Sequence, residues 1–208
     1  MSTVCCIPAR IGSSRIKQKM LINYKGKPLV KYMYDKVSSF GYRTYVVTDS
    51  ERIAELIPKE NVIVSGDASN GTDRISSVVD RISADKIINV QGDLVDVTKE
   101  LILKIEQELD WEQVVTAYTK NEQSVRVVHN YGYANWFTRK DLGYGDYHIG
   151  IYGYKRNPLV WYYVAGRTDA EQIEDLEQLR FLGYYNIGVV EYDYTGIEIN
   201  EQKDLENV

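Results

Sequence analysis

The sequence is poor in the residues that build disulfide frameworks and zinc sites. It contains only two cysteines, the adjacent Cys5 and Cys6, and two histidines, His129 and His148. Neighbouring cysteines rarely bridge each other, and a zinc site normally draws on well-spaced cysteine and histidine ligands. We therefore expect neither a disulfide nor a zinc centre, and we expect both cysteines to be buried in a first strand.

Long apolar runs and leader-like segments are missing too. No stretch approaches the roughly 18 consecutive apolar residues of a membrane-spanning helix, and residues 1–4 lead directly into an apolar strand. We expect a cytoplasmic protein with no membrane partner. The net charge of −5 disfavours a sequence-independent nucleic-acid binder, because such proteins need a broad basic surface.

What the chain does contain is the composition of one globular domain. Its 208 residues are 44% hydrophobic and 26% charged, which fits a single core spanning residues 1–208. Tyrosine is unusually frequent, with 18 residues against 3 phenylalanines and 3 tryptophans. Several of these tyrosines fall between residues 131 and 154, where a flat ring with a polar tip suits a ligand pocket or a subunit contact.

Short apolar segments alternate with amphipathic ones along most of the chain, which is typical of βαβ units and a largely parallel sheet. Residues 124–154 instead alternate in the manner of antiparallel strands. The sequence therefore predicts an α/β fold with a late antiparallel insertion. We expect strands at 4–8, 44–48, 61–64, 86–90, 113–118 and 187–192, and helices at 29–40, 50–56, 72–82, 98–109, 171–181 and from 201.

A basic loop follows the first strand. Arg10, Arg15 and Lys19 place three cations close together, and residues 12–14, Gly-Ser-Ser, offer accessible backbone N–H groups. Ligands of open α/β sheets bind beyond the carboxyl ends of the strands, and point charges with fork-like donors suit a polyphosphate. The loop matches neither a dinucleotide fingerprint nor a P-loop, and on composition alone a solvated basic loop is the somewhat better interpretation.

Asp93 follows the buried strand expected at 86–90, after Gln91 and Gly92. A carboxylate at such a place needs a partner, and a hard cation is an obvious one. Magnesium usually takes one or two carboxylates together with substrate phosphates. Asp93 opposite a phosphate loop is therefore a candidate magnesium ligand, although it can also be a simple turn residue.

Seven segments, taken in order, carry a resemblance to a known family. They are residues 7–15, 25–30, 47–53, 70–75, 89–93, 148–152 and 176–180. The chain resembles the 3-deoxy-D-manno-octulosonate cytidylyltransferase (CMP-Kdo synthetase) family over nearly its whole length. The resemblance implies a Rossmann-like, GT-A-like nucleotidyltransferase fold and a homodimer, with residues 124–170 at the dimer contact and sugar side.

The resemblance also implies a reaction, in which CTP and a sugar acid give a CMP-sugar and pyrophosphate with Mg²⁺ as cofactor. By position, Arg10, Ser13, Arg15 and Lys19 would hold the triphosphate, and residues 71–74 would lie near the cytosine and ribose. The implied catalytic residues are Arg10, Arg15, Lys19 and Asp93. The full nucleotide-binding set is Ala9, Arg10, Gly12, Ser13, Ser14, Lys19, Gly71, Thr72, Asp73 and Arg74.

The acceptor side is carried over in the same way. Gln91 would face the sugar acid, and Arg139 would bind its carboxylate through a bidentate fork. His148, Tyr152, Glu177 and Gln178 fall on positions that line the family's sugar pocket. Glu177 and Gln178 are neighbours on an expected helix and should point about 100° apart, which leaves one of them available for a structural role.

Three departures from the family pattern concern the substrate side and the metal. Residues 18–21 lack a usual glycine and proline, and Leu94 and Val95 replace Glu-Pro. Asn200 stands where the family has its second magnesium-binding aspartate, so Asp93 and Asn200 form the expected metal pair, with Glu198 as a possible substitute. An amide oxygen brings no charge, and we therefore expect weaker metal binding than in a standard member.

Three functions remain open at this point. The first is cytidylyl transfer from CTP to 3-deoxy-D-manno-octulosonate (Kdo). The second is the same transfer to a different acidic acceptor, because the chain is shorter than usual near residues 140–146 and 164–171. The third is a weakened homologue that binds nucleotide without turnover. Pyrophosphate release from CTP with a panel of sugar acids separates them.

Overall fold

The computed structural model describes residues 1–12, 16–196 and 199. The strands are β1 (Thr3–Ala9), β2 (Asn23–Tyr24), β3 (Lys27–Pro28), β4 (Arg43–Thr48), β5 (Val62–Val64), β6 (Lys86–Val90), β7 (Val114–Thr119), β8 (Arg126–Asn130), β9 (Tyr133–Thr138), β10 (Asp146–Lys155) and β11 (Ile187–Glu191). The α-helices are α1 (Leu29–Ser39), α2 (Glu51–Ala54), α3 (Gly71–Ser76), α4 (Lys99–Glu108), α5 (Arg156–Val164) and α6 (Asp169–Glu174). Short 3-10 turns are η1 (Lys19–Leu21), η2 (Lys59–Asn61), η3 (Val79–Arg81) and η4 (Glu177–Arg180).

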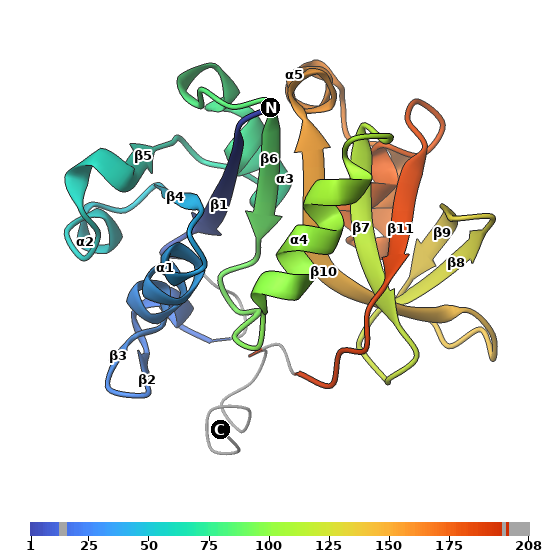
Figure 1. Cartoon of the computed structure of the whole chain (residues 1–208), viewed down its shortest axis with the longest axis horizontal. Coiled ribbons are helices and arrows are strands. Elements are labelled where there is room, and N and C mark those ends of the chain that lie inside the picture. The colour runs from blue at the N-terminus through green and yellow to red at the C-terminus, as the bar shows by residue number, and fades with distance from the viewer. Residues whose placement is uncertain (13–15, 197–198, 200–208) are drawn as a thin grey trace.

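One mixed sheet organises the described part of the chain, with the strand order β5-β4-β1-β6-β10-β7-β11-β9-β8 (Figure 1). The pairings among β5, β4, β1 and β6 are all parallel. From β10 onward the pairings are antiparallel, except for the parallel pair of β7 with β11. The expected α/β class with late antiparallel strands is confirmed.

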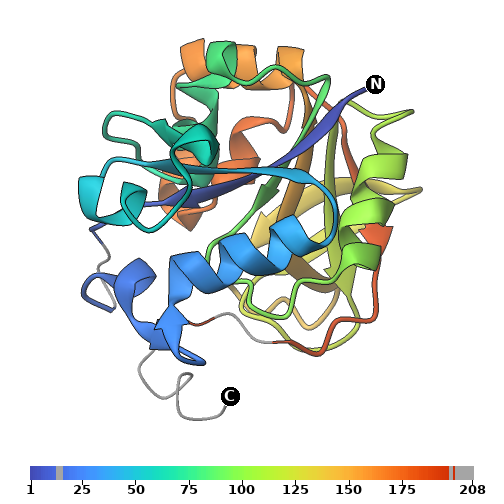
Figure 2. The same cartoon turned by 60° about the vertical axis from the view of Figure 1, so that its left-hand side comes forward.

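Helices cover both faces of this sheet. Helices α1 and α4 pack on one face with Cys5, and α3 and α5 pack on the other with Cys6 (Figure 2). Alternate residues of β1 therefore serve two different cores, as the period of a strand requires. Both cysteines are fully buried, as expected, and burial raises the pKa of the Cys6 thiol to about 12.

Strand β10 lies in the centre of the sheet, between β6 and β7, rather than in an appended unit. Its register places Tyr152 beside Asn89 of β6 and Thr116 of β7. The pairing with β7 shifts between Ile149 and Tyr152, and such bulges commonly redirect side chains next to functional sites. The antiparallel segment is thus part of the core that supports the pocket described below.

Two expected helices differ in the structure. The helix expected at 171–181 begins earlier, because the Thr168 hydroxyl caps α6, and it breaks at Asp175, whose φ of 52° is left-handed. An aspartate tolerates this conformation better than most residues and ends the helix there. The helix expected at 72–82 is also shorter, since α3 ends at Ser76. Its cap is Asn70, whose side chain accepts the Asp73 N–H.

Two further elements were not anticipated from the sequence. Helix α5 is rich in aromatic and β-branched residues, so it lacks a clear amphipathic pattern. The β2–β3 hairpin turns at Lys25 and Gly26, which both have positive φ, as two-residue hairpin turns require. The acidic helix expected from residue 201 lies outside the described residues. In the part of the chain that the structure describes, no helix is long and apolar enough to cross a membrane.

Candidate active site

A pocket of about 320 Å³ opens beyond the carboxyl ends of β1 and β6. This is the place where open α/β sheets bind ligands. The pocket is lined by segments that are far apart in sequence, from the loop after β1 to the η4 turn. The residues expected in a substrate site that line it are Arg10, Lys19, Gly71, Arg74, Gln91, Asp93, Arg139, His148, Tyr152, Glu177 and Gln178.

Other residues expected in the site lie elsewhere. Ala9 is buried in β1, and Gly12 is exposed outside the pocket lining. Thr72 and Asp73 lie behind the pocket wall, where Thr72 is fully buried. Ser13, Ser14, Arg15, Glu198 and Asn200 lie outside the described residues.

The loop after β1 brings cations to the pocket. Arg10 is exposed at the end of β1, and Lys19 begins the η1 turn. The Lys19 ammonium forms an ion pair with the Asp93 carboxylate across the pocket. The basic loop and the acid after β6, predicted separately from the sequence, therefore meet at one point.

Arg74 lies in the same wall, but its guanidinium is already bonded within the protein. It is 2% exposed and donates to Ser65 Oγ at 2.6 Å, to the Gly66 carbonyl at 3.2 Å and to Asp49 Oδ2 at 2.8 Å. The Asp49 carboxylate thus supplies the charged partner of the buried Arg74.

Glu177 connects the start of α3 to the loop after β6. Its carboxylate accepts the Thr72 N–H at the start of α3 at 3.1 Å and the Gln91 side-chain amide at 3.0 Å. Desolvation raises the pKa of Glu177 to about 7, although hydrogen bonds from Thr72 and Gly71 oppose the shift. Both protonation states are therefore accessible near neutral pH.

Gln178 presents a donor to the pocket. Tyr152 OH donates to Gln178 Oε1 at 3.1 Å, which orients the amide, while Nε2 has no hydrogen-bond partner among the described residues. A buried amide nitrogen normally has a partner, so this N–H group is available to a ligand oxygen. Glu177 and Gln178, the first two residues of the η4 turn, both line the pocket.

His148 is buried and bonded rather than free to titrate near neutrality. Its Nε2 lies 2.9 Å from Thr116 Oγ1, and burial, with a contribution from Arg139, lowers its pKa to about 3. The imidazole is therefore neutral at physiological pH and serves as a polar wall. Arg139 is exposed at the edge of the pocket, where it donates to the Asp175 carbonyl at 3.4 Å.

The carboxylates around the pocket are consistent with a magnesium site that the substrate completes. Among the described residues, no group of three or more histidine, cysteine, aspartate or glutamate side chains is placed to hold a metal. Asp93 alone, beside a cationic loop, fits the usual habit of Mg²⁺, which takes few carboxylates and shares substrate phosphates. The Ile199 N–H donates to the Asp93 carbonyl at 3.3 Å, so the chain at residue 199 reaches this point.

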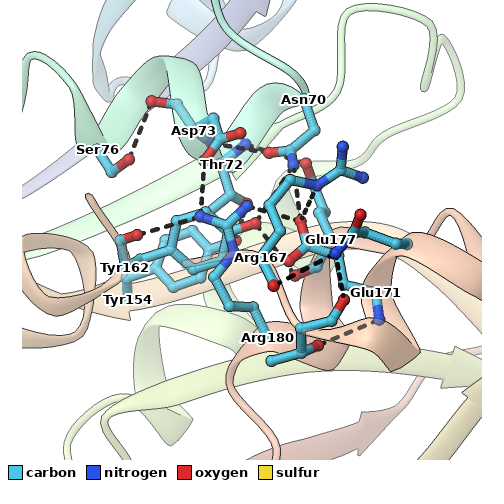
Figure 3. A network of polar contacts seen from close by, with 12 residues as sticks. Asn70, Thr72, Asp73, Ser76, Tyr154, Tyr162, Arg167, Glu171, Glu177 and Arg180 are labelled. Carbon is cyan, nitrogen blue, oxygen red and sulfur yellow. Dashed lines mark hydrogen bonds and ion pairs between the residues drawn. The ribbon is translucent and has the colours of Figure 1, made fainter. Parts of the chain in front are cut away.

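Several lining residues were missed from the sequence, among them Asn70, Arg167, Glu171 and Asp175. Figure 3 shows Asn70, Arg167 and Glu171 in a polar network with Arg180. The Thr168-x-x-Glu171 spacing is a capping-box pattern that would have placed the helix start correctly. No local signal would have shown that Glu171 faces Arg180, because that contact depends on the turn at Asp175.

Comparison with known proteins agrees with this geometry. Residues 4–190 match the model of a family described as cytidylyltransferase. The 3-deoxy-manno-octulosonate cytidylyltransferase of Bartonella henselae is 34% identical, over 100% of this chain and 97% of its own. The 8-amino-3,8-dideoxy-manno-octulosonate cytidylyltransferase of Shewanella oneidensis is 33% identical, over 99% and 96%.

A solved structure gives the same picture. The structure of a CMP:2-keto-3-deoxy-manno-octonic acid synthetase complexed with CTP superposes with a TM-score of 0.91 at 29% identity. The match covers 100% of this chain and 96% of that one. The resemblance seen in the ordered sequence segments is confirmed over the whole length.

Proposed function

The chain belongs to the cytidylyltransferase family, as a relative of the 3-deoxy-manno-octulosonate enzymes, and from this premise we propose that it transfers a cytidylyl group from CTP to Kdo. The pocket supports this function through one arrangement above all. Its lining combines two basic residues, Arg10 and Lys19, with the polar residues Gln91, Glu177 and Gln178. A nucleotide triphosphate and a polyhydroxylated acid need these two chemistries side by side.

The reaction is an in-line displacement at the α-phosphorus of CTP. The anomeric hydroxyl oxygen of the sugar acid forms the new P–O bond, and the bond from the α-phosphorus to the bridging oxygen breaks. Pyrophosphate leaves with the electron pair, and the hydroxyl proton passes to solvent. Such transfers are accelerated mostly by positioning and by charge stabilisation, so no covalent enzyme intermediate is needed.

The basic and the polar residues of the pocket have separate roles. Arg10 and Lys19 stabilise the negative charge that grows on the leaving pyrophosphate. Arg139 pairs with the carboxylate of the acceptor, whose hydroxyl groups bond to Gln91, Glu177 and the free Gln178 amide N–H. These contacts hold the anomeric oxygen in line with the α-phosphorus.

We include Mg²⁺ in this proposal. Asp93 would hold it together with the triphosphate, and Asn200 is the expected second ligand. When bound, the ion neutralises phosphate charge. The Lys19–Asp93 ion pair supplies a positive partner to the Asp93 carboxylate before substrate arrives.

Pyrophosphate release tests the function directly. Purified protein with CTP and Mg²⁺ is offered Kdo, 8-amino-3,8-dideoxy-manno-octulosonate or N-acetylneuraminate, and each reaction is repeated with UTP. We expect CTP- and Kdo-dependent release with formation of CMP-Kdo. Release with a different acid alone would favour the second candidate acceptor class, and CTP binding without release would favour a non-catalytic homologue.

The assembly and location of the enzyme belong to the same proposal. We expect a homodimer in which residues 124–170 contribute to the contact, and sedimentation analysis tests this. We also expect the enzyme to work in the cytoplasm, where CTP is supplied, and cell fractionation tests that expectation.

A further inference from the structure

Arg180 is the centre of a buried ion network beside the pocket. Its side chain is 3% exposed and forms a fork with Glu171, from Nε to Oε2 at 2.7 Å and from Nη2 to Oε1 at 2.6 Å. Its third nitrogen, Nη1, donates to Asp73 Oδ1 at 2.9 Å. Figure 3 shows the guanidinium between Asp73 of α3 and Glu171 of α6, and it lies 3.8 Å from the ring centroid of Tyr162.

The network reaches both walls of the pocket, although Arg180 does not line the pocket itself. Glu171 lines the acceptor side of the pocket, next to the η4 turn that carries Glu177. On the nucleotide side, the Asp73 N–H is held by Asn70, which caps α3 and also lines the pocket. Arg180 therefore contacts one wall directly, through Glu171, and reaches Asn70 in the other wall through Asp73.

The two walls share no local connection, because Asp73 and Arg180 are more than a hundred residues apart in the chain. Other bonds cross between them as well: the Thr72 N–H donates to Glu177 at 3.1 Å, and a Gly71 backbone hydrogen bond reaches the same carboxylate. The Asn70 amide reaches the Tyr162 hydroxyl at 3.3 Å and Glu171 at 3.5 Å. The Arg180 bonds differ from these because they join charged groups and link the start of α3 to both α6 and η4, and lysine cannot reproduce the planar fork.

We propose that Arg180 is a positioning residue that couples CTP binding to sugar-acid binding by fixing the two walls of the pocket against each other. The inference rests on the proposed function, which assigns one wall to each substrate. A ligand that orders one wall orders the other through Arg180, so each substrate strengthens the binding of its partner. Such a coupling is reciprocal and is measured as a ratio of dissociation constants.

The test measures that ratio without turnover. The dissociation constant of CTP is determined by calorimetry, with Mg²⁺, in the absence and presence of a saturating Kdo analogue that lacks the anomeric hydroxyl. For the wild type we expect the analogue to tighten CTP binding at least about fivefold. For Arg180→Lys we expect the ratio to fall toward one.

A second variant and a control keep the result interpretable. Asp73→Asn weakens one arm of the network by removing its negative charge and leaves the Arg180–Glu171 fork intact, so the ratio should fall here also. Arg156→Lys alters an exposed pair with Asp80 and should leave the ratio unchanged. All variants are compared well below their melting temperatures, because a loss of stability alone does not change the ratio in the folded fraction.

Two results would overturn the proposal. One is a wild-type ratio of one, and the other is a wild-type ratio that both Arg180→Lys and Asp73→Asn retain. The proposed function is judged separately, by pyrophosphate release from the wild type with CTP and Kdo. An active wild type with unaltered coupling in the variants would reject the role of Arg180 alone.

Discussion

The guanidinium of Arg74 donates to Asp49 Oδ2 at 2.8 Å, and the other oxygen of Asp49 accepts the Ile11 N–H at 3.2 Å. A buried cation in the pocket wall is thereby linked to the loop that carries Arg10. The Arg52 side chain contacts Gln18 Oε1 at 3.2 Å near the other end of this loop. The segment after β4 therefore anchors the basic loop at both ends.

Asp49→Asn should loosen this anchor. The amide keeps the shape but removes the charge that balances buried Arg74, so we expect a loss of about 2 kcal/mol in the free energy of unfolding. The loop should be less well fixed, and KM for CTP should rise more than KM for the sugar acid. Denaturant unfolding and steady-state kinetics measure the two effects. Asp80→Asn, in an exposed pair, is the matched control and should change neither quantity.

Asp93→Asn separates two roles of the carboxylate. With Mg²⁺ present, the loss of a metal ligand should lower kcat at least about 100-fold. Without metal the same change removes a negative charge next to the triphosphate, so CTP binding in EDTA should become tighter. Steady-state kinetics with Mg²⁺ measures the change in kcat, and calorimetry in EDTA measures the change in CTP affinity. Weaker CTP binding in EDTA would contradict the placement of the phosphates beside Asp93.

Asn200→Asp should restore a charged ligand at the second metal position of the family pattern. We expect the Mg²⁺ concentration for half-maximal activity to fall about tenfold, which corresponds to roughly 1.4 kcal/mol. Titration of activity with Mg²⁺ at saturating CTP measures it. An unchanged magnesium dependence would count against Asn200 as a ligand and would favour Glu198 as the second metal ligand.

The strands of the core could be predicted closely from the sequence because their signal is local. Residues 86–90 include three β-branched apolar residues, Ile87, Ile88 and Val90, and β6 has those bounds. Helix α4 is likewise fixed by a local cap, since the Thr98 hydroxyl accepts the Leu101 N–H. Where the apolar periodicity and the capping residues agree, the helix or strand can be predicted without knowledge of its tertiary contacts.

The pocket wall near residue 175 could not be predicted in this way. An apolar period runs through residues 171–181 and favours a single helix, but the chain turns at Asp175 so that η4 lines the pocket. Contacts with residues distant in sequence stabilise the turn: Arg180 bonds to Asp73, and Glu177 bonds to Thr72. Contacts of this kind carry no periodic signal, and the resemblance to the family indicated Glu177 and Gln178 but not the network that holds them.

The titration of Glu177 predicts a pH-dependent stability. Its pKa is raised from 4.5 to about 7 in the folded protein, so between these values the native state binds the extra proton. The unfolded state binds fewer protons there, and the free energy of unfolding therefore falls as pH rises. The Glu177 contribution is fully present below about pH 4.5 and is lost as pH rises through about 7, with an upper limit of about 3 kcal/mol.

Comparison with Glu177→Gln isolates this contribution, because the amide does not titrate. Unfolding free energies of both proteins are measured by denaturant titration between pH 5 and 8. Relative to wild type, the variant should gain stability as pH rises, since it avoids the desolvated charge. Other titrating groups cancel in the difference. Two curves that stay parallel across this range would show that Glu177 titrates at its ordinary pKa.

Gly71→Ala should disturb the acceptor side through one side chain. A Cβ at residue 71 would lie 3.0 Å from both Gln91 Nε2 and Pro8 Cγ, which is closer than side chains normally approach. Gln91 has the more flexible side chain, so it must move and lose its 3.0 Å bond to Glu177. Losing a hydrogen bond of about 1.5 kcal/mol should raise KM for the sugar acid about tenfold.

The matched control for this substitution is Gly166→Ala, where nothing lies within 4 Å of the added Cβ. It should leave both KM values unchanged. If Gly71→Ala raises KM for CTP as strongly as KM for the acid, the start of α3 has shifted as a whole. If neither KM changes, Gln91 takes no part in acceptor binding. A selective effect on the acid places Gln91 between α3 and the acceptor, where its amide bonds both Glu177 and the substrate.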